Sequence, residues 1–218
     1  MGSLKHLGCR LNTPRRTRGV SLAQGQPHPE LVSDYDADSS STNTSFFTFT
    51  GFRSEPNPPA GAFMVQKASL AEFVALGGLG VSMARLIFQS SSVNPPHIHP
   101  RASELLLVLE GSLTVGLVDT TNKLFVQKLE TGDAFVFPKG LVHFQFNDGQ
   151  YATKAISAFG SSNAGTVSIP ATIFASGIDD QVLSKAFKVN TETIKTLKNA
   201  LTGKRTAKKS VRKTGKKY

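Results

Sequence analysis

The chain has little of what cross-links many proteins or carries them across membranes. Its 218 residues include a single cysteine, Cys9, and no tryptophan. One cysteine cannot form an intrachain disulfide, so cysteine usage does not indicate a redox compartment. No stretch approaches the roughly 18 uninterrupted apolar residues of a membrane-spanning helix. The first 25 residues also lack the apolar segment of a secretory signal, and their Arg-rich, acid-free composition weakly resembles an organelle transit peptide.

Acidic residues are missing from both ends of the chain. Residues 1–25 hold five Lys or Arg and no acid, and residues 204–218 hold eight and no acid. The net charge of +10 therefore belongs to the ends, because the 12 basic residues between them face all 15 acids. This distribution argues against a folded basic face, and we expect no specific nucleic-acid binding. We expect residues 1–25 to be disordered or a targeting segment. Residues 204–218 are expected to form a disordered tail, with a nuclear signal or a polyanion tether as the alternative.

Between the ends the pattern is mostly β. Short apolar runs are separated by Gly, Pro, Asn and Asp, which is typical of a sandwich or barrel. Strands are predicted at 45–52, 81–89, 104–119, 123–130, 133–138, 142–147 and 152–160. After residue 178 the apolar period becomes helical, and two short helices are predicted, the second capped by Asn190 or Thr191. The sequence thus predicts an all-β domain over 26–178, including an N-terminal extension, with a C-terminal helical pair over 179–203.

Two features predict self-association. The run at 104–109 does not alternate between apolar and polar residues, which predicts a strand covered on both faces. One small barrel cannot cover both faces of such a strand. The second predicted helix has a narrow apolar stripe of Ile194, Leu197 and Leu201, which must also be buried against something. We therefore expect association through the barrel sheet and the helical pair.

The segment NPPHIHPRASELLLVLEG, residues 94–111, is the strongest functional pattern. His97 and His99 are two apart, so on an extended segment they point to the same side. Glu104 opens the most hydrophobic strand, where an ionised carboxylate is costly unless it is paired or binds a metal. His143, on the polar face of the strand at 142–147, is the candidate third imidazole. Imidazole and carboxylate ligands without thiolate suit manganese, iron or zinc.

These segments resemble the two motifs of the cupin superfamily, and most closely the germin-like proteins of plants. The first motif is His97, His99, Glu104 and Gly111 with one, four and six residues between them, although Ser91 stands where a glycine usually heads it. The second runs from Gly132 through Pro138, Gly140 and His143 to Asn147. The stretches FPKGLVHFQFN and AFGSSNAGTVSIPATIF add to the resemblance, which covers residues 45–202.

The resemblance implies a jelly-roll β-barrel with C-terminal helices that clasp a neighbouring subunit, in a homohexamer built as a trimer of dimers. It also implies Mn²⁺ held by four ligands, His97, His99, Glu104 and His143. It places the protein outside the cell, in the apoplast. The activity it favours is the dismutation of superoxide, a small anionic substrate. The alternative is a non-catalytic, metal-stabilised storage, cell-wall or receptor protein.

Several departures from the germin pattern matter. Oxalate oxidases of this family hold substrate with two asparagines, of which one corresponds to Asn94 and the other to Ala84, which has no side-chain donor. Oxalate oxidation is therefore the less favoured activity. The usual N-terminal disulfide is absent, so the segment at 26–60 must be held differently or loosely. Asn43 begins an N-glycosylation sequon with Thr44 and Ser45.

Overall fold

We describe the protein from a computed structural model, in which residues 34–40 and 42–202 are placed well enough to describe. The expectations for residues 1–25 and 204–218 lie outside the described residues. The strands within them are β1 (Phe63–Ala68), β2 (Ser82–Phe88), β3 (Val93–Ile98), β4 (Glu104–Glu110), β5 (Ser112–Val118), β6 (Leu124–Glu130), β7 (Ala134–Phe137), β8 (Val142–Phe146), β9 (Thr153–Phe159) and β10 (Val167–Ser168). The helices are α1 (Ile169–Phe174), α2 (Asp180–Phe187) and α3 (Thr191–Leu201), with short 3-10 turns at Gly51–Arg53 and Val74–Leu76.

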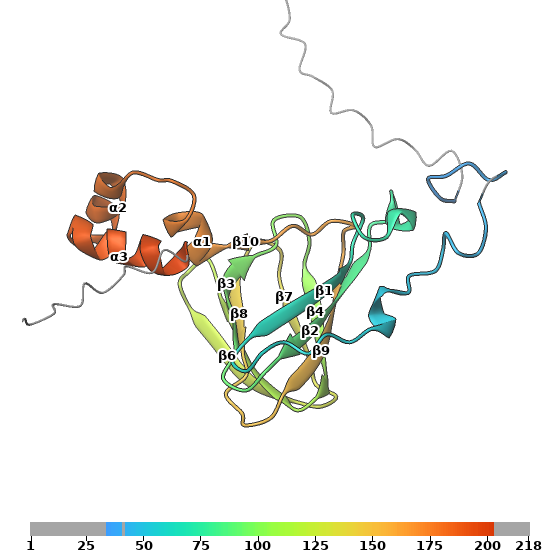
Figure 1. The fold of residues 1–218 in the computed structure, drawn as a ribbon, viewed down its shortest axis with the longest axis horizontal. Coiled ribbons are helices and arrows are strands. Elements are labelled where there is room, and N and C mark those ends of the chain that lie inside the picture. Colours follow the sequence, from blue (N-terminus) through green and yellow to red (C-terminus); the bar gives the residue numbers. More distant parts are fainter. Residues whose placement is uncertain (1–33, 41, 203–218) are drawn as a thin grey trace, which may run out of the picture.

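The strands form two five-stranded antiparallel sheets that face each other and enclose the core (Figure 1). One sheet has the order β1-β2-β9-β4-β7 and the other β10-β3-β8-β5-β6. The inward faces carry the apolar core, which includes Phe88, Leu106, Leu113, Val115 and Phe137, all at most 1% exposed. Figure 1 shows α1, α2 and α3 grouped beside one end of the barrel, next to β10 and β3. This is the predicted all-β jelly-roll barrel with C-terminal helices.

The strand prediction is corrected in three places. The run at 104–119 is two strands, because the chain turns at Gly111, whose φ is +83°. A Cβ there would lie 2.7 Å from Thr153 Oγ1, so the turn needs glycine. Residues 45–52 are turns and the start of a 3-10 helix and form no strand. The third difference is that β1, β3, β10 and α1 exist where no strand or helix was predicted.

The outer face of β4 is uncovered within one chain. Leu105, Leu107 and Leu109 are 53%, 36% and 44% exposed, while Leu106 and Val108 are buried. The prediction that both faces of this strand are covered is therefore wrong for the single chain. Leu105 also lies in register with Val136 and Ala158, both exposed, so the apolar area extends across three strands.

The C-terminal helices have well-defined starts but few buried residues. Asp179 caps α2 by accepting from Gln181 N, and Asn190 caps α3 by accepting from Thr193 N at 2.8 Å. The prediction of Asn190 as a cap is confirmed. On the apolar stripe of α3, Ile194 is fully buried, but Leu197 and Leu201 are 40% and 44% exposed. No helix in the described ranges is long and apolar enough to cross a membrane.

Polar contacts hold the N-terminal extension against the outside of the barrel, where germins usually have a disulfide. Glu55 forms ion pairs with Lys154 at 2.7 Å and Arg85 at 3.5 Å. The Arg85 guanidinium also donates to the Phe52 carbonyl, and Gln66 donates to the Ser54 carbonyl at 3.0 Å. The segment around residues 51–57 is therefore attached through β1, β2 and β9 without any cysteine.

Candidate metal centre

The four predicted ligands come together inside the barrel from three strands and one strand end. His97 lies on β3 in register with His143 on β8, and His99 follows directly after β3. Glu104 is the first residue of β4 in the opposite sheet. Pro95 and Pro96 lie within β3 and keep its backbone extended, which places the two histidines on one side.

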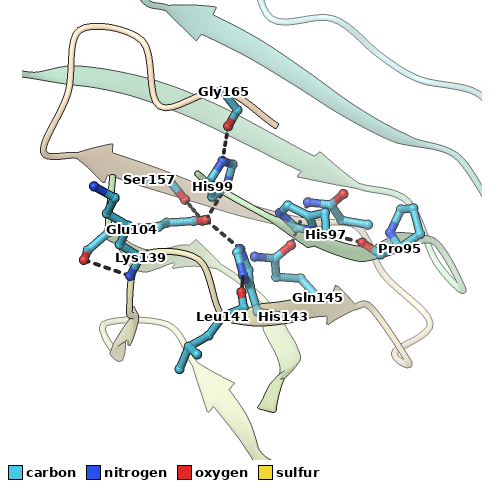
Figure 2. Close-up of polar contacts among 12 residues, drawn as sticks. Pro95, His97, His99, Glu104, Lys139, Leu141, His143, Gln145, Ser157 and Gly165 are labelled. Atoms are coloured by element: carbon cyan, nitrogen blue, oxygen red, sulfur yellow. Dashed lines mark hydrogen bonds and ion pairs between the residues drawn. The ribbon is translucent and has the colours of Figure 1, made fainter. Parts of the chain in front are cut away.

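The potential ligand atoms of His97, His99, Glu104 and His143 lie within 4.8 Å of one another. Glu104 Oε2 is 3.0 Å from His99 Nε2 and 3.2 Å from His143 Nε2. All four residues are buried, with exposures of 2%, 7%, 2% and 1%. Figure 2 shows the imidazoles and the carboxylate pointing toward a common centre.

Backbone carbonyls fix the orientation of every imidazole. Nδ1 of His97 donates to the Pro95 carbonyl at 2.8 Å, and Nδ1 of His143 donates to the Leu141 carbonyl at 2.8 Å. Nδ1 of His99 donates to the Gly165 carbonyl at 2.5 Å (Figure 2). An imidazole that donates from Nδ1 has its Nε2 lone pair free, which is the arrangement that metal-ligating histidines adopt.

The carboxylate is also fixed. Ser157 on β9 donates from Oγ to Glu104 Oε1 at 2.6 Å, and this hydroxyl is fully buried. Burial acts to raise the pKa of Glu104, but the neighbouring His143, His99 and Ser157 side chains outweigh it and lower the pKa to about 2. Burial, and then the neighbouring His143, lower the pKa of His97 to about 4. At neutral pH Glu104 is therefore ionised and His97 neutral, as metal ligands must be.

These observations fit a divalent metal. With each Nδ1 proton directed to a carbonyl, three lone pairs and one negative charge face each other on buried side chains. Without added protons, only a cation satisfies all four groups at once. Nitrogen and oxygen donors without thiolate suit manganese, iron or zinc. The cluster is thus a buried three-histidine, one-glutamate site that could hold a metal ion.

The predicted substrate residue lies beside this cluster. Asn94 lines a cavity of about 170 Å³ that also contacts His97, His99 and Glu104. Its Nδ2 donates to Gln145 Oε1 at 2.7 Å. Ala84 lines the same cavity and is buried. Because its side chain is a methyl group, this position offers no hydrogen-bond donor. A substrate role for Asn94 stays a prediction.

Other predicted or overlooked residues have structural positions. Asn147 is fully buried and donates to the carbonyls of Phe88, Gln89 and Tyr151, so it has a structural role. Asn43 is exposed and accepts from Ser45, so its sequon lies on the surface while its glycosylation stays a prediction.

Ser157 and Gly165 were not predicted as parts of the site. Ser157 belongs to an ordinary strand pattern, and the role of Gly165 depends on its carbonyl. Only the inward-facing parity of Ser157 on its strand could have indicated it. Gln145 lies two residues after His143 on β8 and is fully buried with it.

Comparisons with known proteins agree with this geometry. A profile of the cupin family matches residues 53–195. Germin-like protein 9-3 of Oryza sativa subsp. japonica is 53% identical over 185 residues, which cover 80% of this chain and 86% of the relative. The rhicadhesin receptor of Pisum sativum is 44% identical over 144 residues, which cover 65% of each chain. A recombinant oxalate oxidase in complex with glycolate superposes with a TM-score of 0.74 at 34% identity, covering 81% of this chain and 98% of that one. By its sequence, its fold and its buried histidines and glutamate, the chain belongs to the germin-like proteins of the cupin family.

Proposed function

We propose that His97, His99, Glu104 and His143 hold one Mn²⁺ ion and that this centre disproportionates superoxide. The observation that carries the proposal is the convergence of three Nε2 atoms on a buried carboxylate, with every Nδ1 proton already committed to a backbone carbonyl. Four protein ligands leave two positions of an octahedron open. Mn²⁺ is the ion that the germin resemblance implies for this donor set.

Bound manganese would supply a one-electron couple that can both accept an electron from superoxide and return one to it. The chain's own residues would do the rest. Glu104 and the three neutral imidazoles together carry one negative charge. A bound Mn²⁺ would therefore keep a net positive charge, which attracts a small anion. Ser157 keeps the carboxylate oriented and ionised. The cavity beside His97 and His99 gives access from outside.

Oxalate oxidation is the weaker candidate activity. The oxalate oxidase to which the chain is similar contains bound glycolate, which supports a site for small oxygen anions here too. However, Ala84 offers no amide to such a ligand, and a missing hydrogen bond to a charged group lowers efficiency by about 10- to 150-fold.

A non-catalytic role is the second candidate function. The observation that favours it is the similarity to a protein named as a receptor. In that case the metal would stabilise the barrel without turnover. Assays at full metal occupancy separate this role from the first.

The resemblance to germins also supports a homohexamer, a trimer of dimers, in the apoplast. Exposed leucines on β4 and the half-exposed stripe of α3 are surfaces that a second copy would bury. Light scattering at micromolar concentration gives the mass directly. A stable monomer would contradict the hexamer.

The proposed function is tested by measuring metal content and superoxide consumption on the same purified chain. We expect about one manganese per chain and activity that disappears in His143→Ala. The matched control is Lys128→Gln, which changes an exposed residue of β6 that is not part of the cluster. A fully loaded chain without superoxide or oxalate turnover would favour the non-catalytic role, and a folded chain that binds no metal would contradict both.

A further inference from the structure

The cavity beside the metal cluster is larger and more apolar than a diatomic substrate requires. Its volume is about 170 Å³. The apolar part of its lining comes from β1, β2 and the end of β9, namely Phe63, Val65, Ala84, Leu86 and Phe159. An apolar cavity of about 150 Å³ is large enough for a benzene-sized molecule. Space therefore exists for a hydrocarbon group next to the metal position.

Ala84 contributes to this apolar lining next to Ser157, the residue that contacts Glu104. Across the sheet it lies between Lys67 on β1 and Ser157 on β9. Ser157 is the residue that holds the carboxylate of Glu104, so a single strand, β9, separates Ala84 from the strand of this ligand. An amide at position 84 would fill this space with polar atoms. The methyl group instead extends the apolar surface toward the metal position.

The lining of the cavity also includes a positively charged residue, Lys67. Lys67 is exposed and lines the cavity on the same face of β1 as Phe63 and Val65. Its charge acts on Glu72 through space, but its ammonium makes no hydrogen bond or ion pair with the residues that the structure describes. An exposed cation in the lining of a cavity attracts anions.

From these lining groups we infer that the cavity binds a 2-hydroxy or 2-oxo carboxylate that carries a hydrocarbon side chain. The inference rests on the proposed metal centre. The carboxylate and the 2-oxygen would bind at the open metal positions beside Asn94. The hydrocarbon side chain would lie along Phe63, Val65 and Leu86. Lys67 would attract the anion and would contribute little to the selectivity between ligands with different hydrocarbon side chains.

The test is isothermal titration of the manganese-loaded protein, with the metal content measured before each titration. The probes are glycolate, lactate, 2-hydroxybutyrate, 2-hydroxyisovalerate and oxalate. We expect Kd to fall about fourfold for each carbon added from glycolate to 2-hydroxybutyrate, which is the usual effect of burying a methylene. We expect oxalate to bind more weakly than 2-hydroxybutyrate.

Two variants separate the contributions. Ala84→Asn is expected to tighten oxalate about 10-fold or more and to weaken 2-hydroxybutyrate, because the amide replaces apolar wall by a donor. Lys67→Gln is expected to weaken the four monoanionic probes by a similar factor and the oxalate dianion by more, and to reduce the salt dependence of Kd. The control is Lys128→Gln, which removes the same charge from β6 outside the cavity. It is expected to change neither the Kd values nor their salt dependence.

The outcomes distinguish this inference from the function on which it rests. A loaded wild-type chain whose Kd stays constant or rises along the series would overturn the inference and leave the metal centre standing. A chain that retains no manganese would overturn the proposed function and the inference together. If Ala84→Asn does not fold, the wild-type series and Lys67→Gln still test whether the cavity binds the hydrocarbon side chain and the anion.

Discussion

Replacing Ser157 by alanine removes the hydrogen bond that its Oγ donates to Glu104 Oε1 at 2.6 Å. Ser157 and Glu104 are 0% and 2% exposed, so water cannot take over the lost contact. A hydrogen bond to a charged group contributes about 1.5–3 kcal/mol. Loss of a residue that orients a metal ligand typically lowers metal affinity by about 10- to 100-fold.

Both effects can be measured on one variant. Chelator competition gives the manganese affinity of Ser157→Ala, and urea unfolding of the metal-free chain gives its stability. The control is Ser90→Ala, which removes a hydrogen bond from Ser90 Oγ to the Gly149 carbonyl at 2.7 Å, away from the cluster. We expect Ser90→Ala to lower stability without changing metal affinity. Unchanged manganese affinity in Ser157→Ala would refute the conclusion that this hydroxyl fixes the carboxylate ligand.

Three further changes have expected outcomes. Acidification should destabilise the metal-free fold in two steps. The unfolded chain takes up a proton at His97 near pH 6.5 and the folded chain only near pH 4, so stability on the order of 3 kcal/mol is lost between these values. Because the pKa of Glu104 is lowered in the fold, further stability is lost between about pH 4.5 and pH 2. Unfolding curves from pH 8 to pH 3 measure this, and a flat profile down to pH 4 would contradict the pKa shift of His97. Leu105→Glu, at a 53% exposed position on β4, should reduce the assembly to smaller species in light scattering without unfolding the barrel. An unchanged mass would show that this face is not an interface. Oxalate oxidation should be weak or absent in the wild type and partly restored in Ala84→Asn, as measured by peroxide release. Efficient oxalate turnover by the wild type would place substrate recognition elsewhere.

Much of the site was predictable because its residues have a fixed spacing on strands of known parity. His97 and His99 share a face because they are two apart, and the structure places them together with Glu104 and His143. The cap at Asn190 was predictable because its side chain satisfies a backbone donor within three residues. Such local geometry is recorded in the sequence itself.

The remaining features depend on distant parts of the chain. The aromatic run at 45–52 has strand-like composition, but Phe46 and Phe47 pack edge-to-face at 5.0 Å within turns, and no neighbouring strand pairs with them. The break at Gly111 depends on its close approach to Thr153, 42 residues later. Gly165 acts through a carbonyl that reaches His99, 66 residues earlier. No local pattern encodes these contacts.

The most direct test of the metal centre is anomalous X-ray diffraction at the manganese absorption edge, on crystals of the protein purified with manganese. The proposed centre predicts one strong peak per chain, in contact with Nε2 of His97, His99 and His143 and with the carboxylate of Glu104. Metal-saturated crystals with no peak among these four side chains would contradict it.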